Sequence, residues 1–201
     1  MVYTKKDLIT FETSLAEKFN RGEIHHPIHL SNGNEDKLIE IFKDIREKDW
    51  IFGSWRSHYQ CLLKGVPQAI LLEAISKGQS MALCFPEYRI YCSAIVSGQM
   101  PQALGVAAAI KRNNGNETVW CFIGDMTAET GVAQTVFEYA KNWDLPIKFV
   151  IEDNGKSVLT DTRSVWNTKI LRFENTANEK ISHFKYQSRY PHAGAGVRVQ
   201  F

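Results

Sequence analysis

Two apolar runs in this sequence each end in side chains that carry oxygen. Residues 119–123 are followed by Gly124 and Asp125, and residues 147–151 lead to Asp153 and Asn154. Both runs are typical of buried strands, and the residues between them predict one helix over roughly 128–143. Because strands joined through a helix run parallel, Asp125 and Asn154 are expected at the same edge of the sheet, where ligands bind.

The residue types at these two strand ends suit a hard cation and an anion. Carboxylate and amide oxygens are ligands for magnesium or calcium, and magnesium usually shares its coordination sphere with phosphate oxygens. Gly124 leaves room for a ligand close to the backbone, and the amides of Met126 and Thr127 precede the helix, where they can point at an anion. The residues alone also allow a simpler interpretation, in which Asp125 caps the helix that follows it.

Composition predicts an ordinary globular domain and argues against several other classes of protein. The 201 residues are 44% hydrophobic and 23% charged, with a net charge of +2. We expect one domain over residues 1–201, with helices in the first 50 residues. Without a cluster of basic residues, nucleic acid is not an expected partner. Nor is a membrane, since no run reaches the roughly 18 apolar residues of a span and the N-terminus lacks an apolar signal core.

The four cysteines indicate a reduced compartment. None of them forms a C-x-x-C pair, which argues against a zinc site or a redox dithiol. We therefore expect buried free thiols and a cytoplasmic location. The cysteines are Cys61, Cys84, Cys92 and Cys121.

The remaining periodicities predict an α/β fold with a parallel sheet flanked by helices. Thr4 and Asp7 resemble a capping box for a helix that ends near residue 20, and Asn34 is expected to open a second helix. Residues 52–65 are expected to be irregular structure that runs into a short helix. The other expected elements are a helix from Pro67 to Gly78, an extended segment over 88–96, a buried helix over 101–115, a mixed polar region over 155–190 and a last strand over 197–201.

Three blocks of this sequence resemble the alpha subunits of 2-oxo acid dehydrogenase E1 components. "WRSHYQCLLKG" is similar to the family's YRxHxxxLxRG, and "SAIVSGQMPQALGVAAAIK" is similar to its GIVGxQxPxAxGxAxAxK. "GDMTAETGVAQTVFEYAKNWDLPIKFVIEDN" resembles the family's thiamine-diphosphate motif, which begins Gly-Asp-Gly and closes with Asn-Asn. The blocks follow the family's order and cover roughly residues 50–160, so the resemblance implies a thiamine-diphosphate-binding fold.

The resemblance also implies a cofactor, a metal and the residues that hold them. Asp125, Asn154 and the backbone carbonyl of Lys156 would coordinate magnesium (Mg2+). Ala94 and Val96 would offer backbone groups to the aminopyrimidine ring of thiamine diphosphate. The other residues that would contact the cofactor are Trp55, Arg56, Ile95 as a wedge under the bent cofactor, Gly124, Met126 and Thr127.

The sequence departs from the family in several places. Gly-Asp-Gly is replaced by Gly-Asp-Met, so the side chain of Met126 has to find space beside the diphosphate. Asp153 stands where the motif has its first asparagine, and Trp55 stands where the family usually has tyrosine. The chain is also much shorter than the usual E1 alpha subunit.

Histidines are the expected catalytic residues, because the family uses them in loops beside the thiazolium ring. His58 lies in the first block and His192 precedes a Gly-rich turn, and both are candidates. For each, a structural hydrogen bond is the alternative. The histidines of "HHPIH", residues 25–29, are expected in a loop, and Glu138 is expected on a helix surface or at an interface.

The resemblance implies a partner as well. The glutamate that activates the cofactor comes from a pyrimidine-binding domain of the beta subunit, and this chain shows no second domain to supply it. We therefore expect a beta-like partner in an alpha2beta2 hetero-oligomer that decarboxylates a small 2-oxo acid or cleaves a ketose-like donor. A transketolase-like or sulfopyruvate-decarboxylase-like split subunit and a non-catalytic cofactor-binding module are the alternatives. A NAD-binding domain is excluded, because no G-x-G-x-x-G follows an early strand.

Overall fold

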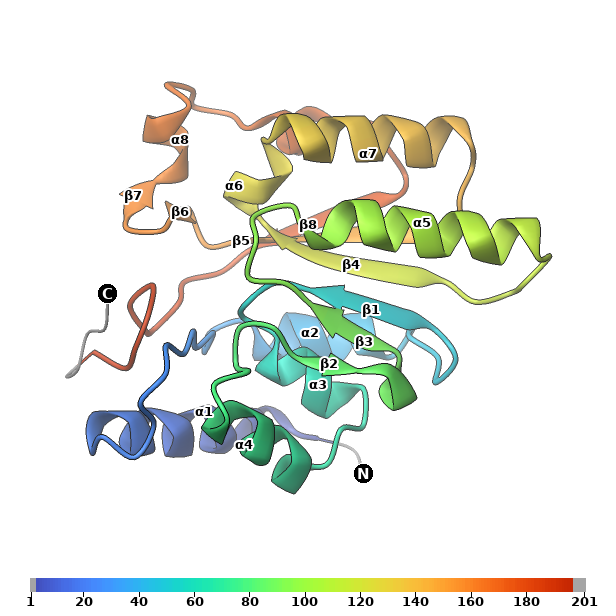
Figure 1. Cartoon of the computed structure of the whole chain (residues 1–201). Helices are drawn as coiled ribbons and strands as arrows, with labels where there is room; N and C mark the ends of the chain where they lie inside the picture. Colours follow the sequence, from blue (N-terminus) through green and yellow to red (C-terminus); the bar gives the residue numbers. More distant parts are fainter. Residues whose placement is uncertain (1–2, 197–201) are drawn as a thin grey trace.

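The centre of the molecule is a six-stranded sheet. The computed structural model describes residues 3–196, and its strands follow the order β2-β3-β1-β4-β5-β8 (Figure 1). Five strands run parallel, and the two-residue strand β2 pairs antiparallel with β3. The strands are β1 (Trp50–Gly53), β2 (Cys84–Phe85), β3 (Ile90–Cys92), β4 (Val119–Gly124), β5 (Ile147–Asp153) and β8 (Ile181–Lys185).

Helices cover both faces of this sheet, which confirms the predicted α/β class. One face packs against α1 (Lys5–Asn20), α2 (Glu35–Phe42), α3 (His58–Leu63) and α4 (Gln68–Ser76). The other face packs against α5 (Gln99–Arg112) and α7 (Gly131–Asn142) (Figure 1). Along β4, for example, Phe122 belongs to the first core and its neighbours Cys121 and Ile123 belong to the second. Burial on both faces explains why β4 and β5 are continuous apolar runs.

The first helix begins where the sequence predicts. Thr4 and Asp7 form the predicted capping box, in which each side chain accepts from the other's backbone N–H. Leu8 and Phe11, like the other apolar residues on this helix face, are at most 5% exposed. The helix therefore packs one apolar stripe against α2 and α3.

Two of the parallel strands of the sheet were not predicted from the sequence. Residues 50–53 join β3 and β4 as the strand β1, although the irregular segment had been expected from Phe52 onward. β8 lies within the region expected to be mixed and polar, and it pairs with β5. Both are short, and β8 is only partly buried, so neither has the apolar run that marks β4 and β5. The strand expected over residues 197–201 lies outside the described residues.

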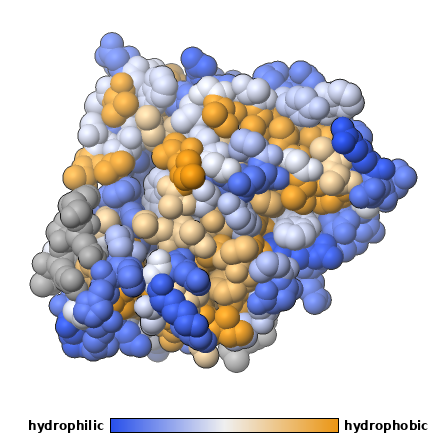
Figure 2. Space-filling view, viewed as in Figure 1, coloured by the Kyte–Doolittle hydropathy of each residue, from blue (hydrophilic) through white to orange (hydrophobic). Residues whose placement is uncertain are grey.

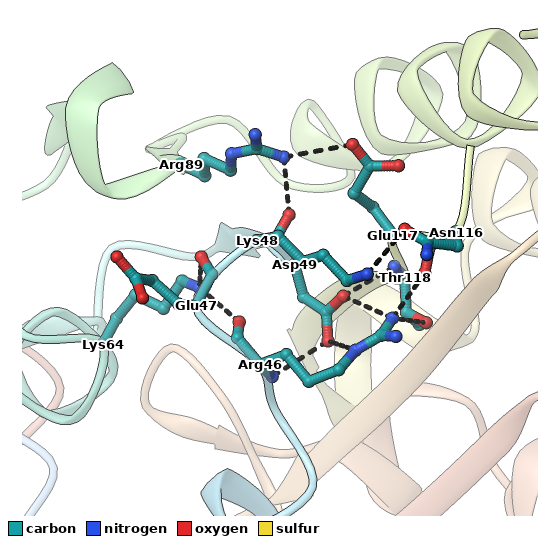
Figure 3. Close-up of polar contacts among 9 residues, drawn as sticks. All are labelled: Arg46, Glu47, Lys48, Asp49, Lys64, Arg89, Asn116, Glu117 and Thr118. Atoms are coloured by element: carbon teal, nitrogen blue, oxygen red, sulfur yellow. Dashed lines mark hydrogen bonds and ion pairs between the residues drawn. The ribbon is translucent and has the colours of Figure 1, made fainter.

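A network of charged side chains holds the starting ends of β1 and β4 together (Figure 3). Asp49 is 1% exposed, and its carboxylate accepts from the backbone N–H of Thr118 at 2.8 Å and from Arg46 Nη2 at 2.7 Å. Lys64 Nζ donates to two backbone carbonyls of the turn before β1, and Arg89 Nη1 donates to a third at 2.6 Å. The network fixes the register of the two strands, whose far ends reach the opposite edge of the sheet.

None of the helices within residues 3–196 is both long enough and apolar enough to cross a membrane.

Candidate functional site

A cleft opens at the carboxyl ends of β1, β4 and β5, on the edge of the sheet that the strand pattern predicted. Its volume is about 630 Å³ when the open solvent at its mouth is included. Ten of the predicted site residues line it: Trp55, Arg56, Val96, Gly124, Asp125, Met126, Thr127, Asn154, Lys156 and His192. The sequence blocks far apart in the chain therefore meet at one cleft, as expected for strand ends of a parallel sheet.

Asp125 is the most unusual group in the cleft. It follows β4 as the first residue of the short helix α6 (Asp125–Ala128) and is 1% exposed. Its Oδ2 atom is buried without a hydrogen-bond partner among the described residues. Burial, together with the negative charge of Asp153, raises the pKa of Asp125 to about 6, although the nearby buried side chain of Thr162 acts to lower it. A buried carboxylate oxygen left unpaired in this way is suited to a cation that is brought into the cleft.

The capping interpretation of Asp125 is wrong. Gly124 occupies the N-cap of α6, and no side-chain hydrogen bond caps that helix within the described part of the chain. A Cβ atom added at Gly124 would meet nothing within 4 Å, because this position faces the open cleft. Gly124 therefore keeps the space beside Asp125 free for a ligand.

Asn154 and Asp153 differ sharply in their surroundings. Asp153 Oδ2 accepts from Arg163 Nη2 at 2.9 Å, and its Oδ1 accepts from the backbone N–H of Gly155 at 2.9 Å. Asn154 instead lines the cleft, and its Oδ1 accepts from the backbone N–H of Lys156 at 3.0 Å. The charge of Asp153 is thus balanced by Arg163. Asp125 and Asn154, in contrast, have side-chain oxygens that line the cleft and could bind a cation.

A metal at this edge would need mixed oxygen ligands. Across residues 3–196 no three His, Cys, Asp or Glu side chains are grouped as a metal site. The donors present are a carboxylate on Asp125, an amide on Asn154 and the backbone carbonyl of Lys156, in the short hairpin of β6 (Lys156–Ser157) and β7 (Thr160–Asp161). Such a set fits magnesium that completes its sphere with water and phosphate oxygens.

The side chain of Met126 contacts the segment that follows β5. Trp166 follows the helix α8 (Thr162–Val165), and its Nε1 donates to Met126 Sδ at 3.1 Å. Met126 is half-buried at the lip of the cleft. The methionine that replaces the family's glycine therefore packs against the segment that follows β5.

Arg56 is already partly engaged by the protein. Its Nη1 donates to the carbonyl of Leu30 at 2.7 Å, and its Nη2 donates to the carbonyl of His192 at 2.9 Å. Trp55 and His192 both line the cleft beside it. Arg56 therefore joins two loops at the wall of the cleft, with some of its donors left for a ligand.

The structure does not bring His58 to the cleft. Its side chain is fully buried in the helical layer, with Nε2 at 2.9 Å from Ser80 Oγ and Nδ1 at 3.4 Å from Glu12 Oε1. His58 is the first residue of α3, which packs against α1, so the ring points into that layer and away from the strand ends. His58 therefore has the structural hydrogen-bonding role that was the alternative to a catalytic role.

Two predicted cofactor contacts lie beside the cleft without lining it. Ala94 and Ile95 belong to the loop between β3 and α5, next to Val96, which does line the cleft. The side chains of Ile95 and Val96 are 71% and 47% exposed. The loop therefore presents apolar side chains outward at the cleft's edge.

Sequence reasoning missed Glu152. It is 7% exposed at the end of β5 and lines the cleft. Asn34 Nδ2 donates to its Oε1 at 2.8 Å, and Gln60 Nε2 donates to its Oε2 at 3.0 Å. Burial raises the pKa of Glu152 to about 8. The sequence did contain one sign of this residue, because an acidic side chain is unusual in a strand that is otherwise apolar and buried on both faces.

The fold and the cleft together define an α/β protein with a cleft at the carboxyl edge of a parallel sheet, where such folds usually bind their ligands. The chain belongs to the dehydrogenase E1 component family, whose model matches residues 3–172. This match confirms the resemblance found in the sequence blocks.

Three relatives give the scale of the similarity. The alpha subunit of acetoin:2,6-dichlorophenolindophenol oxidoreductase from Cupriavidus necator is 30% identical over 77% of this chain and 50% of its own length. The pyruvate dehydrogenase E1 component subunit alpha from Rickettsia bellii is 30% identical over 75% and 49%. The mitochondrial 2-oxoisovalerate dehydrogenase subunit alpha from Bos taurus is 27% identical over 77% and 36%. The chain thus spans half or less of the length of these relatives.

Proposed function

We propose that this chain is the alpha-like subunit of a thiamine-diphosphate- and magnesium-dependent enzyme that decarboxylates a 2-oxo acid and transfers the acyl fragment. The observation that carries the proposal is the unpaired carboxylate oxygen of Asp125, buried in a cleft that it shares with Asn154. Family membership supports it, and so do the names of relatives that act on pyruvate and 2-oxoisovalerate.

The residues of the cleft fit this cofactor. Asp125 and Asn154 would hold magnesium with the carbonyl of Lys156, and the backbone around Gly124 would face the diphosphate. When bound, thiamine diphosphate supplies a carbon centre that stores the electrons of a broken carbon–carbon bond. The other residues assigned to it are Trp55, Arg56, Ala94, Ile95, Val96, Met126 and Thr127.

The protein side chains around the cleft would orient the ligand and limit water. Arg56 adds a positive charge near the diphosphate position, which favours an anion there. His192 lines the same cleft and is the remaining candidate for proton handling or substrate recognition, since His58 lies elsewhere. Val96 and Val158 give the cleft apolar edges that reduce the access of water.

A beta-like subunit would complete the site. The alpha designation of the relatives supports a partner, and we propose an alpha2beta2 assembly in which that partner supplies a pyrimidine-binding domain and the activating glutamate. Apolar side chains stand exposed around the cleft, and Figure 2 shows orange patches over the loop before α5 and over the β6–β7–α8 segment. The most exposed of these are Ile95, Val158 and Leu159, at 71%, 51% and 62%.

A non-catalytic cofactor-binding module is the second candidate, and Met126 favours it. The Met126 side chain stands where the family motif has glycine, and its contact with Trp166 restrains the segment that carries Lys156. A chain of this kind could hold the cofactor and stabilise a partner without turnover.

Thermal melting tests the binding proposal. We expect thiamine diphosphate and magnesium together to raise the melting temperature more than either alone, and Asp125→Ala to remove that joint shift. Asp36→Ala, a change at an exposed residue on α2, is the matched control and should keep it. A joint shift that survives Asp125→Ala would remove Asp125 from the metal site.

Turnover separates the two candidate functions. An enzyme should consume a 2-oxo acid only after a beta-like protein is added, with an artificial electron acceptor as the readout. A complex that binds the cofactor but turns over no 2-oxo acid or ketose donor would leave the binding module as the function.

A further inference from the structure

His192 lies at the edge of the cleft between three side chains. Its ring packs edge-on against His29, with centroids 4.9 Å apart, and edge-on against Trp55, with centroids 6.0 Å apart. Arg56 Nη2 is 3.4 Å from its Nδ1 and 2.9 Å from its backbone carbonyl. The ring is therefore restrained on several sides while it still lines the cleft.

The loop that carries His192 is tied to a loop near the N-terminus. Gly194 N–H donates to the carbonyl of Ile28 at 2.8 Å, and Arg189 N–H donates to the carbonyl of Asn32 at 3.0 Å. Arg56 joins the same two loops through its bonds to the carbonyls of Leu30 and His192. The position of His192 thus depends on residues about 160 positions earlier in the chain.

The chemistry of Arg56 decides which nitrogen of His192 carries the proton. A guanidinium group has five N–H donors and no acceptor, and it stays protonated in proteins. A nitrogen that faces it at hydrogen-bond distance has to offer a lone pair. Because Arg56 faces Nδ1, the proton of the neutral ring is on Nε2.

We propose that Arg56 is a positioning residue that holds His192 as the neutral tautomer protonated on Nε2, so that the ring offers a ligand an N–H donor. Burial and the charge of Arg56 lower the pKa of His192 below its ordinary value, which keeps the ring neutral near pH 7. The other titratable group packed against the ring is His29, and Asp125, Glu152, Lys156 and Tyr186 share the cleft.

The tautomer has a consequence for recognition that rests on the proposed function. An N–H donor binds an oxygen acceptor, such as the carboxylate or carbonyl oxygen of a 2-oxo acid, and it cannot remove a proton. His192 would then stabilise the substrate or the charge that develops on its oxygen, and it would not act as the general base.

Nuclear magnetic resonance of the chain labelled at its histidine ring nitrogens tests the proposal without any cofactor. We expect His192 Nδ1 to give a pyridine-type signal and Nε2 a pyrrole-type signal at neutral pH. His183, which is exposed on β8, should show the averaged signals of a ring that exchanges tautomers. His192→Gln identifies the resonance. A proton found on Nδ1, or averaged signals for His192, would overturn the proposal.

Arg56→Met then tests the role of Arg56. This variant should give averaged signals at His192 and a His192 pKa closer to the ordinary value, with the amide spectrum unchanged outside the two loops that Arg56 joins. Unchanged His192 signals in a folded Arg56→Met chain would contradict the positioning role. If that variant does not fold, the tautomer measured in the native chain still tests whether His192 carries its proton on Nε2. Because no cofactor is present, failure here is distinct from failure to bind thiamine diphosphate.

Discussion

The indole N–H of Trp166 donates to the thioether sulfur of Met126 across 3.1 Å. Met126 directly follows the candidate metal ligand Asp125, and Trp166 ends the segment that begins with Lys156. The same segment is held by an ion pair between Arg163 Nη2 and Asp153 Oδ2 at 2.9 Å. Two contacts thus bind the β6–β7–α8 segment to the side of the cleft that carries Asp125.

Met126→Gly should loosen this segment. Contacts between sulfur and aromatic rings contribute about 0.3–1.5 kcal/mol, so we expect amide hydrogen exchange over residues 156–166 to rise by about 2- to 12-fold. Trp166→Phe should raise exchange in the same residues, because it removes the other partner of the contact. Exchange in β4 is the internal reference. If Trp166→Phe leaves exchange over 156–166 unchanged, the contact does not hold the segment.

Asp49→Ala should lower the free energy of unfolding by about 2–3 kcal/mol, because a buried carboxylate loses charge-assisted bonds at the start of β1. Burial acts to raise the pKa of Asp49, but the hydrogen bonds from Arg46 and Thr118 outweigh it and leave the pKa lowered. Its stabilisation is therefore full above the ordinary value of 3.8 and is lost as the pH falls through the lower folded value.

Urea unfolding at pH 7 and pH 3 measures both effects of Asp49→Ala. The difference from the native chain should be smaller at pH 3. Asp36→Ala, at an exposed ion pair on α2, should change stability by less than about 1 kcal/mol. An Asp49→Ala chain as stable as the control would show that the network in Figure 3 is not stabilising.

The parts of the fold that the sequence predicted are those with a long local signal. β4 and β5 have six and seven residues and are buried on both faces, so their apolar runs are unmistakable. α1 has both a capping box and an apolar stripe. β1 has four residues, and it is a strand because β3 and β4 bond to it on either side, which is information held elsewhere in the chain.

The candidate site divides in the same way. Residues carried by a motif at strand ends, such as Asp125 and Asn154, were predicted and do line one cleft. Glu152 was missed because its partners Asn34 and Gln60 are 118 and 92 residues away. His58 lies in a recognised motif yet points into the helical layer, because a motif fixes the backbone path but not what packs around each side chain.

Glu152→Gln should make stability less dependent on pH. Burial raises the pKa of Glu152 from 4.5 to about 8, so the folded chain holds this proton more tightly than the unfolded chain. The free energy of unfolding should therefore fall as the pH rises from about 4.5 to 8, and between pH 6 and pH 8 the native chain should lose about 2 kcal/mol.

Urea unfolding between pH 6 and pH 8 checks this expectation. Glu152→Gln should remove most of the decline, since glutamine is neutral and still offers an acceptor to Asn34 or Gln60 after an amide flip. Glu179→Gln, at an exposed residue before β8, is the control and should retain the decline. A native chain whose stability is flat over this range would contradict a buried, proton-binding Glu152.

Asp125→Asn should stabilise the ligand-free chain while it weakens metal binding. The ionised carboxylate is buried and unpaired at Oδ2, and burial raises its pKa from 3.8 to about 6, so at pH 7 the folded chain carries an unfavourable charge. Asparagine removes that charge with little change in shape. We expect a gain of roughly 1–3 kcal/mol in the free energy of unfolding at pH 7, and a much smaller gain at pH 4, where the native carboxyl group is protonated.

Magnesium with thiamine diphosphate should reverse the order of stability, so that the native chain becomes more stable than Asp125→Asn. The native protein gains from placing a cation beside Asp125, whereas Asp125→Asn offers the cation only a neutral oxygen, so the ligand should raise the melting temperature of the native chain more. Melting curves at pH 7 with and without the ligands measure both effects in one experiment. A carboxylate that serves only to bind a ligand destabilises the ligand-free protein, so its replacement should stabilise that form. If Asp125→Asn is instead less stable than the native chain without ligands, Asp125 is a structural residue with a partner inside the fold.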